Sequence, residues 1–147
     1  MMNYKNIRWS KLFAALYPGY FDRPGIRALP AGGEWDEMAL DLKTFRPDAV
    51  PIDVPDGITF GLYDGDTAAL RRDVLRVDEG WPELFNDGSR VYCAFDGGKV
   101  ASFCLLEHMG DYEGLRVGGP GCVGTLPEYR RRGIGLKMVQ DATAILA

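Results

Sequence analysis

The chain has 147 residues, of which 46% are hydrophobic and 26% charged, a balance typical of a globular domain with a packed core. These values exclude disordered, collagen-like and coiled-coil classes, and the length allows one domain, with or without an appendage. The net charge of -4 argues against a chain that as a whole binds nucleic acid or a membrane surface. No apolar run approaches the roughly 20 residues of a membrane-spanning helix, and the N-terminus lacks the apolar core of a signal peptide, so we expect a cytoplasmic protein.

The N-terminal part of the chain contains two amphipathic patterns. Apolar residues recur at helical spacing within residues 5–17 and again within residues 35–45, and a proline ends each run. We predict two helices there and find no chemical motif in either. Residues 1–56 are therefore expected to form a helical extension, and residues 57–147 a separate unit that carries the function.

A strand and a helix are predicted next. The β-rich run at residues 58–63 indicates the strand, and Asp66 after it can cap the helix. A short turn or helix is expected at residues 82–88. The apolar face of the capped helix would carry Leu70, Val74, Val77 and Trp81.

The clearest local signal is a β-hairpin. Two β-rich runs are joined by Asp96-Gly97-Gly98-Lys99, and Gly-Gly favours a two-residue hairpin loop. If Asp96 faces Lys99, the register pairs Phe95 with Val100 and Cys93 with Ser102. Both faces of this hairpin are largely apolar, which predicts a position within a sheet that is covered on both sides.

The segment after residue 117 holds the chemistry. Gly118-Gly119-Pro120-Gly121 leads into a strand that ends near Leu126, and Pro120 implies a bulge or loop because proline cannot donate a ladder hydrogen bond. Pro127-Glu128-Tyr129 predicts a turn, and the arginines and glycines of residues 130–135 open a helix. The apolar face of that helix would carry Ile134, Met138, Ala142 and Ile145.

This segment is also basic. From Gly114 onward five basic residues stand against two acidic ones, although the net charge of the whole chain is -4. A helix start offers unpaired N–H groups and the positive end of the dipole, and glycines let a phosphate approach the main chain closely. The pattern Arg-x-x-Gly-x-Gly therefore favours a pyrophosphate site at residues 130–136 over a merely solvated basic face. A Walker loop and a dinucleotide fingerprint do not fit, because neither Gly-Lys-Ser/Thr nor the three-glycine spacing is present.

Residues 123–135, Val-Gly-Thr-Leu-Pro-Glu-Tyr-Arg-Arg-Arg-Gly-Ile-Gly, resemble the acyl-CoA-binding motif of the GNAT superfamily of N-acetyltransferases. The order of elements from Ile58 is similar to the first half of that fold, an α/β fold with a mixed sheet. The resemblance implies acetyl-CoA as the acyl donor, with main-chain groups of Val123 and Thr125 on the pantetheine arm and one N–H polarising the thioester carbonyl. It further implies a pyrophosphate held by the N–H groups of Arg131, Arg132, Gly133, Ile134, Gly135 and Leu136, with Arg130 at the family's Arg or Gln position.

Transfer to an amine also needs a base, and in this family a carboxylate acting directly or through water is common. Glu107 is the first candidate, because it closes the strand that ends at Leu106, near the acceptor side of the expected cleft. His108, Asp111 and Glu113 could serve instead, and each of the four taken singly is also interpreted as an ordinary polar loop residue.

The remaining candidate ligands do not predict a metal. Cys93, Cys104 and Cys122 lie in apolar runs and not at metal-ligand spacing, so we expect reduced core thiols rather than a disulfide or zinc framework. The single histidine, His108, has no identifiable companion ligands.

The resemblance also implies more chain than is present. Only 12 residues follow Gly135, whereas a complete GNAT domain continues into a parallel strand, a further helix and final strands. We therefore expect a GNAT-like fold truncated after the cofactor strand and helix, an N-acetyltransferase of a primary amine that is active only with its missing C-terminal half. Because the motif strand would have an unpaired edge, that half, a partner chain or a second copy is expected to associate with it. The alternative is a non-catalytic acyl-CoA-binding or interaction module completed by a partner chain.

Overall fold

The computed structural model describes residue 42 and residues 46–47, 49–112 and 115–147. Apart from Leu42, the two helices expected within residues 5–17 and 35–45 lie outside the described residues. The division of the chain at residue 56 therefore stays a prediction.

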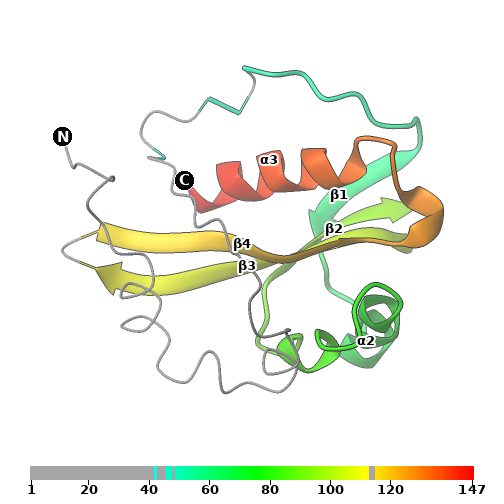
Figure 1. Cartoon of the computed structure of the whole chain (residues 1–147), viewed down its shortest axis with the longest axis horizontal. Helices are drawn as coiled ribbons and strands as arrows, with labels where there is room; N and C mark the ends of the chain where they lie inside the picture. Colours follow the sequence, from blue (N-terminus) through cyan, green and yellow to red (C-terminus); the bar gives the residue numbers. More distant parts are fainter. Residues whose placement is uncertain (1–41, 43–45, 48, 113–114) are drawn as a thin grey trace, which may run out of the picture.

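Four strands form one antiparallel sheet in chain order (Figure 1). They are β1 (Ile58–Leu62), β2 (Val91–Asp96), β3 (Lys99–Tyr112) and β4 (Leu115–Thr125). Helix α2 (Thr67–Leu75) covers one face of the sheet and helix α3 (Ile134–Leu146) covers the other, with short 3-10 helices η4 (Pro82–Leu84) and η5 (Pro127–Tyr129) in the connections. The predicted α/β class and the order of elements are confirmed. The parallel pairing of a mixed sheet does not occur among the described strands.

The β2–β3 hairpin has the predicted turn but not the predicted register throughout. Asp96 pairs with Lys99 and Phe95 with Val100, as expected, whereas Cys93 pairs with Phe103. The predicted pairing of Cys93 with Ser102 was wrong because the register shifts between Ala94 and Phe95, where β3 carries an extra residue in a β-bulge. Phe103 consequently packs on the same face as Cys93, in one apolar cluster.

Strands β3 and β4 are longer than predicted, so the Gly-Gly-Pro-Gly segment lies inside the ladder. Pro120 pairs with Leu106, and the N–H of Leu106 donates instead to the carbonyl of Arg90 on the β2 side, at 2.8 Å. This pair is therefore a non-hydrogen-bonded one, and Pro120 needs no donor there. The expected irregularity lies two residues further on, at Cys122, where φ is 45° and the register against β3 shifts.

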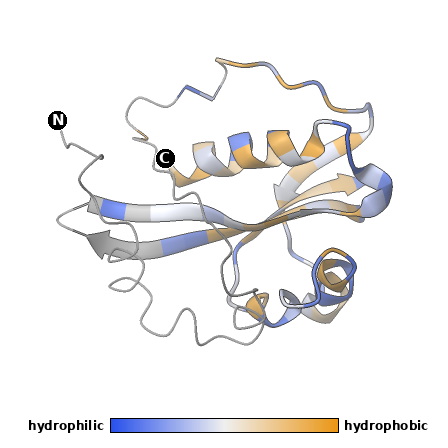
Figure 2. Ribbon diagram, in the orientation of Figure 1, coloured by the Kyte–Doolittle hydropathy of each residue, from blue (hydrophilic) through white to orange (hydrophobic). Residues whose placement is uncertain are grey.

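Apolar side chains pack on both faces of the sheet, as the hairpin predicted. Figure 2 shows hydrophobic residues along the central part of the sheet and in α3. On the α2 side Leu70 and Val74 pack against buried side chains of β2 and β3. On the α3 side Ile134, Met138 and Ala142 do the same. Ile145, expected on that face, is 42% exposed, and Leu146 packs against the cluster in its place.

The helix ends follow the local signals. The Asp66 side chain accepts hydrogen bonds from the N–H groups of Ala68 and Ala69, which confirms the predicted cap. Helix α2 ends at Leu75, so Val77 and Trp81 lie beyond it, although both pack against the α2-side cluster.

None of the three cysteines forms a disulfide, and Cys93 and Cys104 are buried core residues. Burial raises the pKa of each of these two thiols to about 12. They are therefore protonated at neutral pH and act as small apolar side chains.

Candidate functional site

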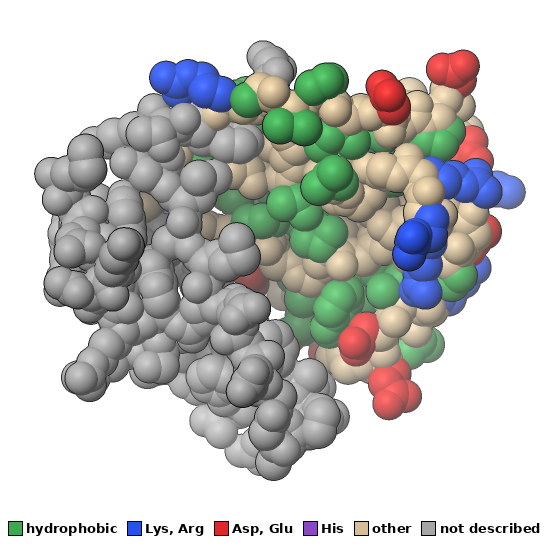
Figure 3. All heavy atoms as spheres, turned by 45° about the horizontal axis from the view of Figure 1, so that its top comes forward, with side chains coloured by type: hydrophobic (Ala, Val, Ile, Leu, Met, Phe, Trp, Pro, Cys, Tyr) green, Lys and Arg blue, Asp and Glu red, His purple; other side chains and the backbone are tan. Residues whose placement is uncertain are grey.

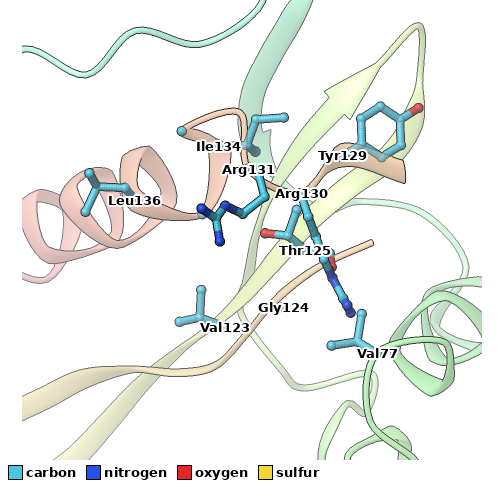
Figure 4. A pocket seen from close by; sticks show the side chains of 11 residues that line it. Val77, Val123, Gly124, Thr125, Tyr129, Arg130, Arg131, Ile134 and Leu136 are labelled. Atoms are coloured by element: carbon cyan, nitrogen blue, oxygen red, sulfur yellow. The ribbon is translucent and has the colours of Figure 1, made fainter. Parts of the chain in front are cut away.

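A pocket of about 490 Å³ lies where β4 ends and α3 begins (Figure 4). The turn after α2, the end of β4, η5, the arginine loop and the first turn of α3 contribute to it. Its lining residues are Val77, Val123, Gly124, Thr125, Tyr129, Arg130, Arg131, Gly133, Ile134, Gly135 and Leu136. The structure thus brings together all the residues predicted to hold a cofactor except Arg132, which is exposed beside them.

Strand β4 is an edge strand of the described sheet, with β3 as its neighbour. The N–H of Leu126 donates to the carbonyl of Ala101 at 3.0 Å, so Leu126 pairs toward β3. Because pairing directions alternate along an antiparallel strand, the main-chain groups of Thr125 and Val123 point toward the open edge. The carbonyl of Thr125 accepts there from Nε of Arg130 at 3.0 Å. An extended ligand can therefore lie along this edge.

The start of α3 supplies main-chain donors to the same pocket. The first helical hydrogen bond runs from the N–H of Lys137 to the carbonyl of Gly133, at 3.0 Å. The N–H groups of residues 134–136 precede that ladder, at the positive end of the helix dipole. This arrangement favours an anionic ligand group.

The arginine side chains differ in direction. In Figure 4 the Arg130 guanidinium extends toward Val77, whereas that of Arg131 extends over the pocket between Thr125 and Leu136. Arg131 adopts a left-handed backbone conformation with φ of 63°, uncommon for a residue with a Cβ. Figure 3 shows basic side chains gathered at the η5 end of the molecule.

Gly133 has a packing role that the motif alone does not reveal. It caps α3 with φ of 78°, and a Cβ atom on it would lie 2.5 Å from the carbonyl oxygen of Asp53. The segment before β1 therefore passes so close to the start of α3 that only a glycine fits at residue 133. The nearby contact between the Gln140 side chain and the carbonyl of Val50, at 2.8 Å, holds the same segment against α3.

Ser102 on β3 holds the end of β4 through hydrogen bonds. The sequence by itself did not predict this role. Ser102 is fully buried on β3, and its hydroxyl donates to the carbonyl of Gly124 at 2.7 Å and lies 3.0 Å from the Thr125 hydroxyl oxygen. The available signal was a single serine inside an apolar β-run, since a buried hydroxyl needs partners.

We expect Ser102→Ala to lower the free energy of unfolding by about 1–2 kcal/mol, because it leaves polar groups of β4 without their buried partner. Urea denaturation measures this loss. Ser89→Ala is the matched control, since the Ser89 hydroxyl accepts a hydrogen bond from the N–H of Asn86 in an exposed loop. This variant should lose less free energy of unfolding. Equal losses in the two variants would contradict a special role of Ser102.

Glu107 does not line the pocket and does not end a strand as predicted. It lies inside β3, paired with Gly119, and shares the α2-side face with Leu105. A Cβ atom on Gly121 would collide with the Glu107 carboxylate, so the carboxylate lies directly against β4 beside the Cys122 bulge. His108 is exposed and alternates to the other face. Asp111 lies further along β3, and Glu113 is outside the described residues.

The described residues contain neither a metal-binding cluster nor a membrane-spanning helix. Within the described ranges, no group of three or more His, Cys, Asp or Glu side chains is placed to hold a metal ion. None of the helices in that part of the chain has the length and apolarity needed to cross a bilayer.

Residues 60–147, more than half of the chain, match the acetyltransferase (GNAT) family. The chain therefore belongs to the GNAT family of acetyltransferases. Among solved structures it is similar to a GCN5-related N-acetyltransferase from Kribbella flavida, with 18% sequence identity and a TM-score of 0.47. The similarity covers 67% of this chain and 39% of that one, so the chain spans well under half of that protein. No curated protein matches the chain.

Proposed function

We propose that this chain binds acetyl-CoA in the pocket between β4 and α3 and supplies the cofactor half of an N-acetyltransferase acting on a primary amine. The observation that carries the proposal is the meeting of the arginine loop, the start of α3 and a β4 edge that no strand of the described ranges pairs with, at one pocket. Membership of the GNAT family supports acetyl-CoA as the donor. A volume of about 490 Å³ suits the pocket of a small organic ligand.

The pantetheine arm would pair with the main chain of Val123 and Thr125 along the β4 edge. The pyrophosphate would take the N–H groups of residues 131–136, where the helix dipole stabilises negative charge. Arg130 would act mainly by holding the Thr125 carbonyl, since its Nε is already bonded there. Arg131, whose guanidinium extends over the pocket, would contact the phosphates directly.

The reaction would be direct attack in a ternary complex. The amine nitrogen bonds to the thioester carbon, the C–S bond breaks, the amine proton passes to Glu107 directly or through water, and CoA leaves as its thiolate. A main-chain N–H of β4 aimed at the carbonyl oxygen would stabilise the developing oxyanion. The position of Glu107 against the bulged part of β4 supports its role as the base.

Calorimetry with acetyl-CoA tests the binding step. We expect a dissociation constant within about 1 µM to 1 mM, the usual range for enzyme substrates. Release of free CoA thiol in the presence of a panel of primary amines tests the transfer step. Absence of binding at millimolar acetyl-CoA would reject the proposal.

A second candidate is a non-catalytic acyl-CoA-binding or interaction module completed by a partner chain. It is favoured by the outer edge of β4, with which no described strand pairs, together with the adjoining face of α3, where Leu136 is 63% and Val139 37% exposed. An unpaired edge beside apolar surface attracts another strand. We propose that transfer activity likewise requires a further segment at this edge, from the same protein, a partner or a second copy. Binding of acetyl-CoA without thiol release for any amine, alone or in such a complex, would favour the non-catalytic module.

A further inference from the structure

An ion pair joins α2 to the motif outside the pocket. Arg76 caps the C-terminus of α2, and its Nη2 lies 2.9 Å from both carboxylate oxygens of Glu128 in η5. The residues that follow each partner, Val77 and Tyr129, both line the pocket. The pair therefore connects two walls of the pocket that are 52 residues apart in the chain.

Stability alone explains this pair poorly. Both side chains are 48% exposed, and ion pairs with that exposure contribute little to folding. Glu128 is, however, a carboxylate within the basic segment, two residues before Arg130. Its pKa lies below the usual range, because its own backbone N–H and the Arg76 guanidinium donate to it, so it is ionised at neutral pH. Unpaired, it would repel an anionic ligand at the arginine loop.

We propose that Arg76 is a positioning residue for the acyl-CoA phosphates: it neutralises Glu128 and holds both oxygens of that carboxylate against α2. The inference rests on the proposed function of the pocket and extends the cofactor site to a residue outside the motif. Figure 4 shows the two walls concerned, with Arg130 extending toward Val77. Two contacts to one carboxylate fix its orientation better than one.

Three variants of the full chain test this by calorimetry with CoA at low salt: Arg76→Ala, Glu128→Gln and the double variant. Arg76→Ala should weaken CoA binding about three- to tenfold at low ionic strength. The effect should shrink in about 1 M salt, where the Debye length falls to about 3 Å and charges are screened from one another. Glu128→Gln should not weaken binding. The double variant should return to within about twofold of Glu128→Gln, because the repelling carboxylate is gone.

The controls separate this effect from loss of net charge. Arg72→Ala removes the same charge from an exposed position on α2 and should change CoA affinity less than about twofold. Arg76 also lowers the pKa of Asp73, which burial raises, so Arg76→Ala alters a second carboxylate. Only the recovery in the double variant assigns the effect to Glu128. The loss should also be smaller for dephospho-CoA, which carries one phosphate fewer.

Failure of the parent chain to bind CoA would reject the proposed function and this inference with it. If the parent chain binds and Arg76→Ala binds equally well, the inference alone is overturned. It is also overturned if the double variant stays as weak as Arg76→Ala, since the pair would then be a mechanical clamp rather than a neutralised charge.

Discussion

Glu107→Gln is expected to lower kcat for acetyl transfer roughly hundredfold and to leave the KM for acetyl-CoA within about twofold, since a general base contributes at least that much. The measurement is steady-state thiol release with the amine that reacts fastest in the panel. Glutamine preserves the size of the side chain beside Gly121 but cannot take the proton.

His108→Gln is the matched control for this prediction. His108 follows Glu107 on β3 but alternates to the opposite face of the strand. Its replacement should leave kcat unchanged. If kcat of Glu107→Gln equals that of the parent, or if His108→Gln loses as much, the base has been assigned to the wrong residue.

Gly133→Ala is expected to lower the free energy of unfolding by about 2–4 kcal/mol and to weaken acetyl-CoA binding at least tenfold. Two penalties combine: a left-handed φ of 78° and a Cβ atom 2.5 Å from the Asp53 carbonyl oxygen. Relief of that contact must move either the segment before β1 or the loop that opens α3. Moving the loop displaces the N–H groups proposed to hold the pyrophosphate.

Gly98→Ala separates the two penalties. Gly98 has a comparable φ of 86°, but nothing lies within 4 Å of a Cβ placed on it. It should cost only about 1–2 kcal/mol, the left-handed penalty, and leave acetyl-CoA binding unchanged. Chemical denaturation measures the free energy of unfolding of both variants, and calorimetry measures their acetyl-CoA binding. Equal losses of unfolding free energy would show that the Asp53 contact is easily relieved.

The local elements followed from signals a few residues long. The Gly97-Gly98 loop, the Asp66 cap and the spacing of Ile134, Met138 and Ala142 each indicated a structure that the fold contains. They were predictable because a turn, a cap and a helix face depend on neighbours within about one turn of chain. The motif likewise marked most of the pocket lining, since main-chain donors at a helix start come from consecutive residues.

The predictions that were wrong depend on how two segments far apart in the chain pair with each other. The bulge between Ala94 and Phe95 changed every later pair of the hairpin, and nothing local to the turn required it. Strands β3 and β4 continue beyond the pair of Leu106 and Pro120, which makes them longer than predicted. This is possible because Pro120 lies in a non-hydrogen-bonded pair, which depends on the register and not on the composition. Glu107 therefore lies inside β3 and not at the strand end that was predicted for it.

The sequence by itself determined the α/β class and the GNAT motif, and it predicted an anion site at the start of α3, because these depend on the chemistry of neighbouring residues. Tertiary structure alone decided that Asp53 passes Gly133, that Ser102 holds the end of β4 and that Arg76 pairs with Glu128. Each of these contacts joins residues more than twenty positions apart, and such contacts are set by how the sheet faces and helices pack against one another, which no short stretch of sequence specifies.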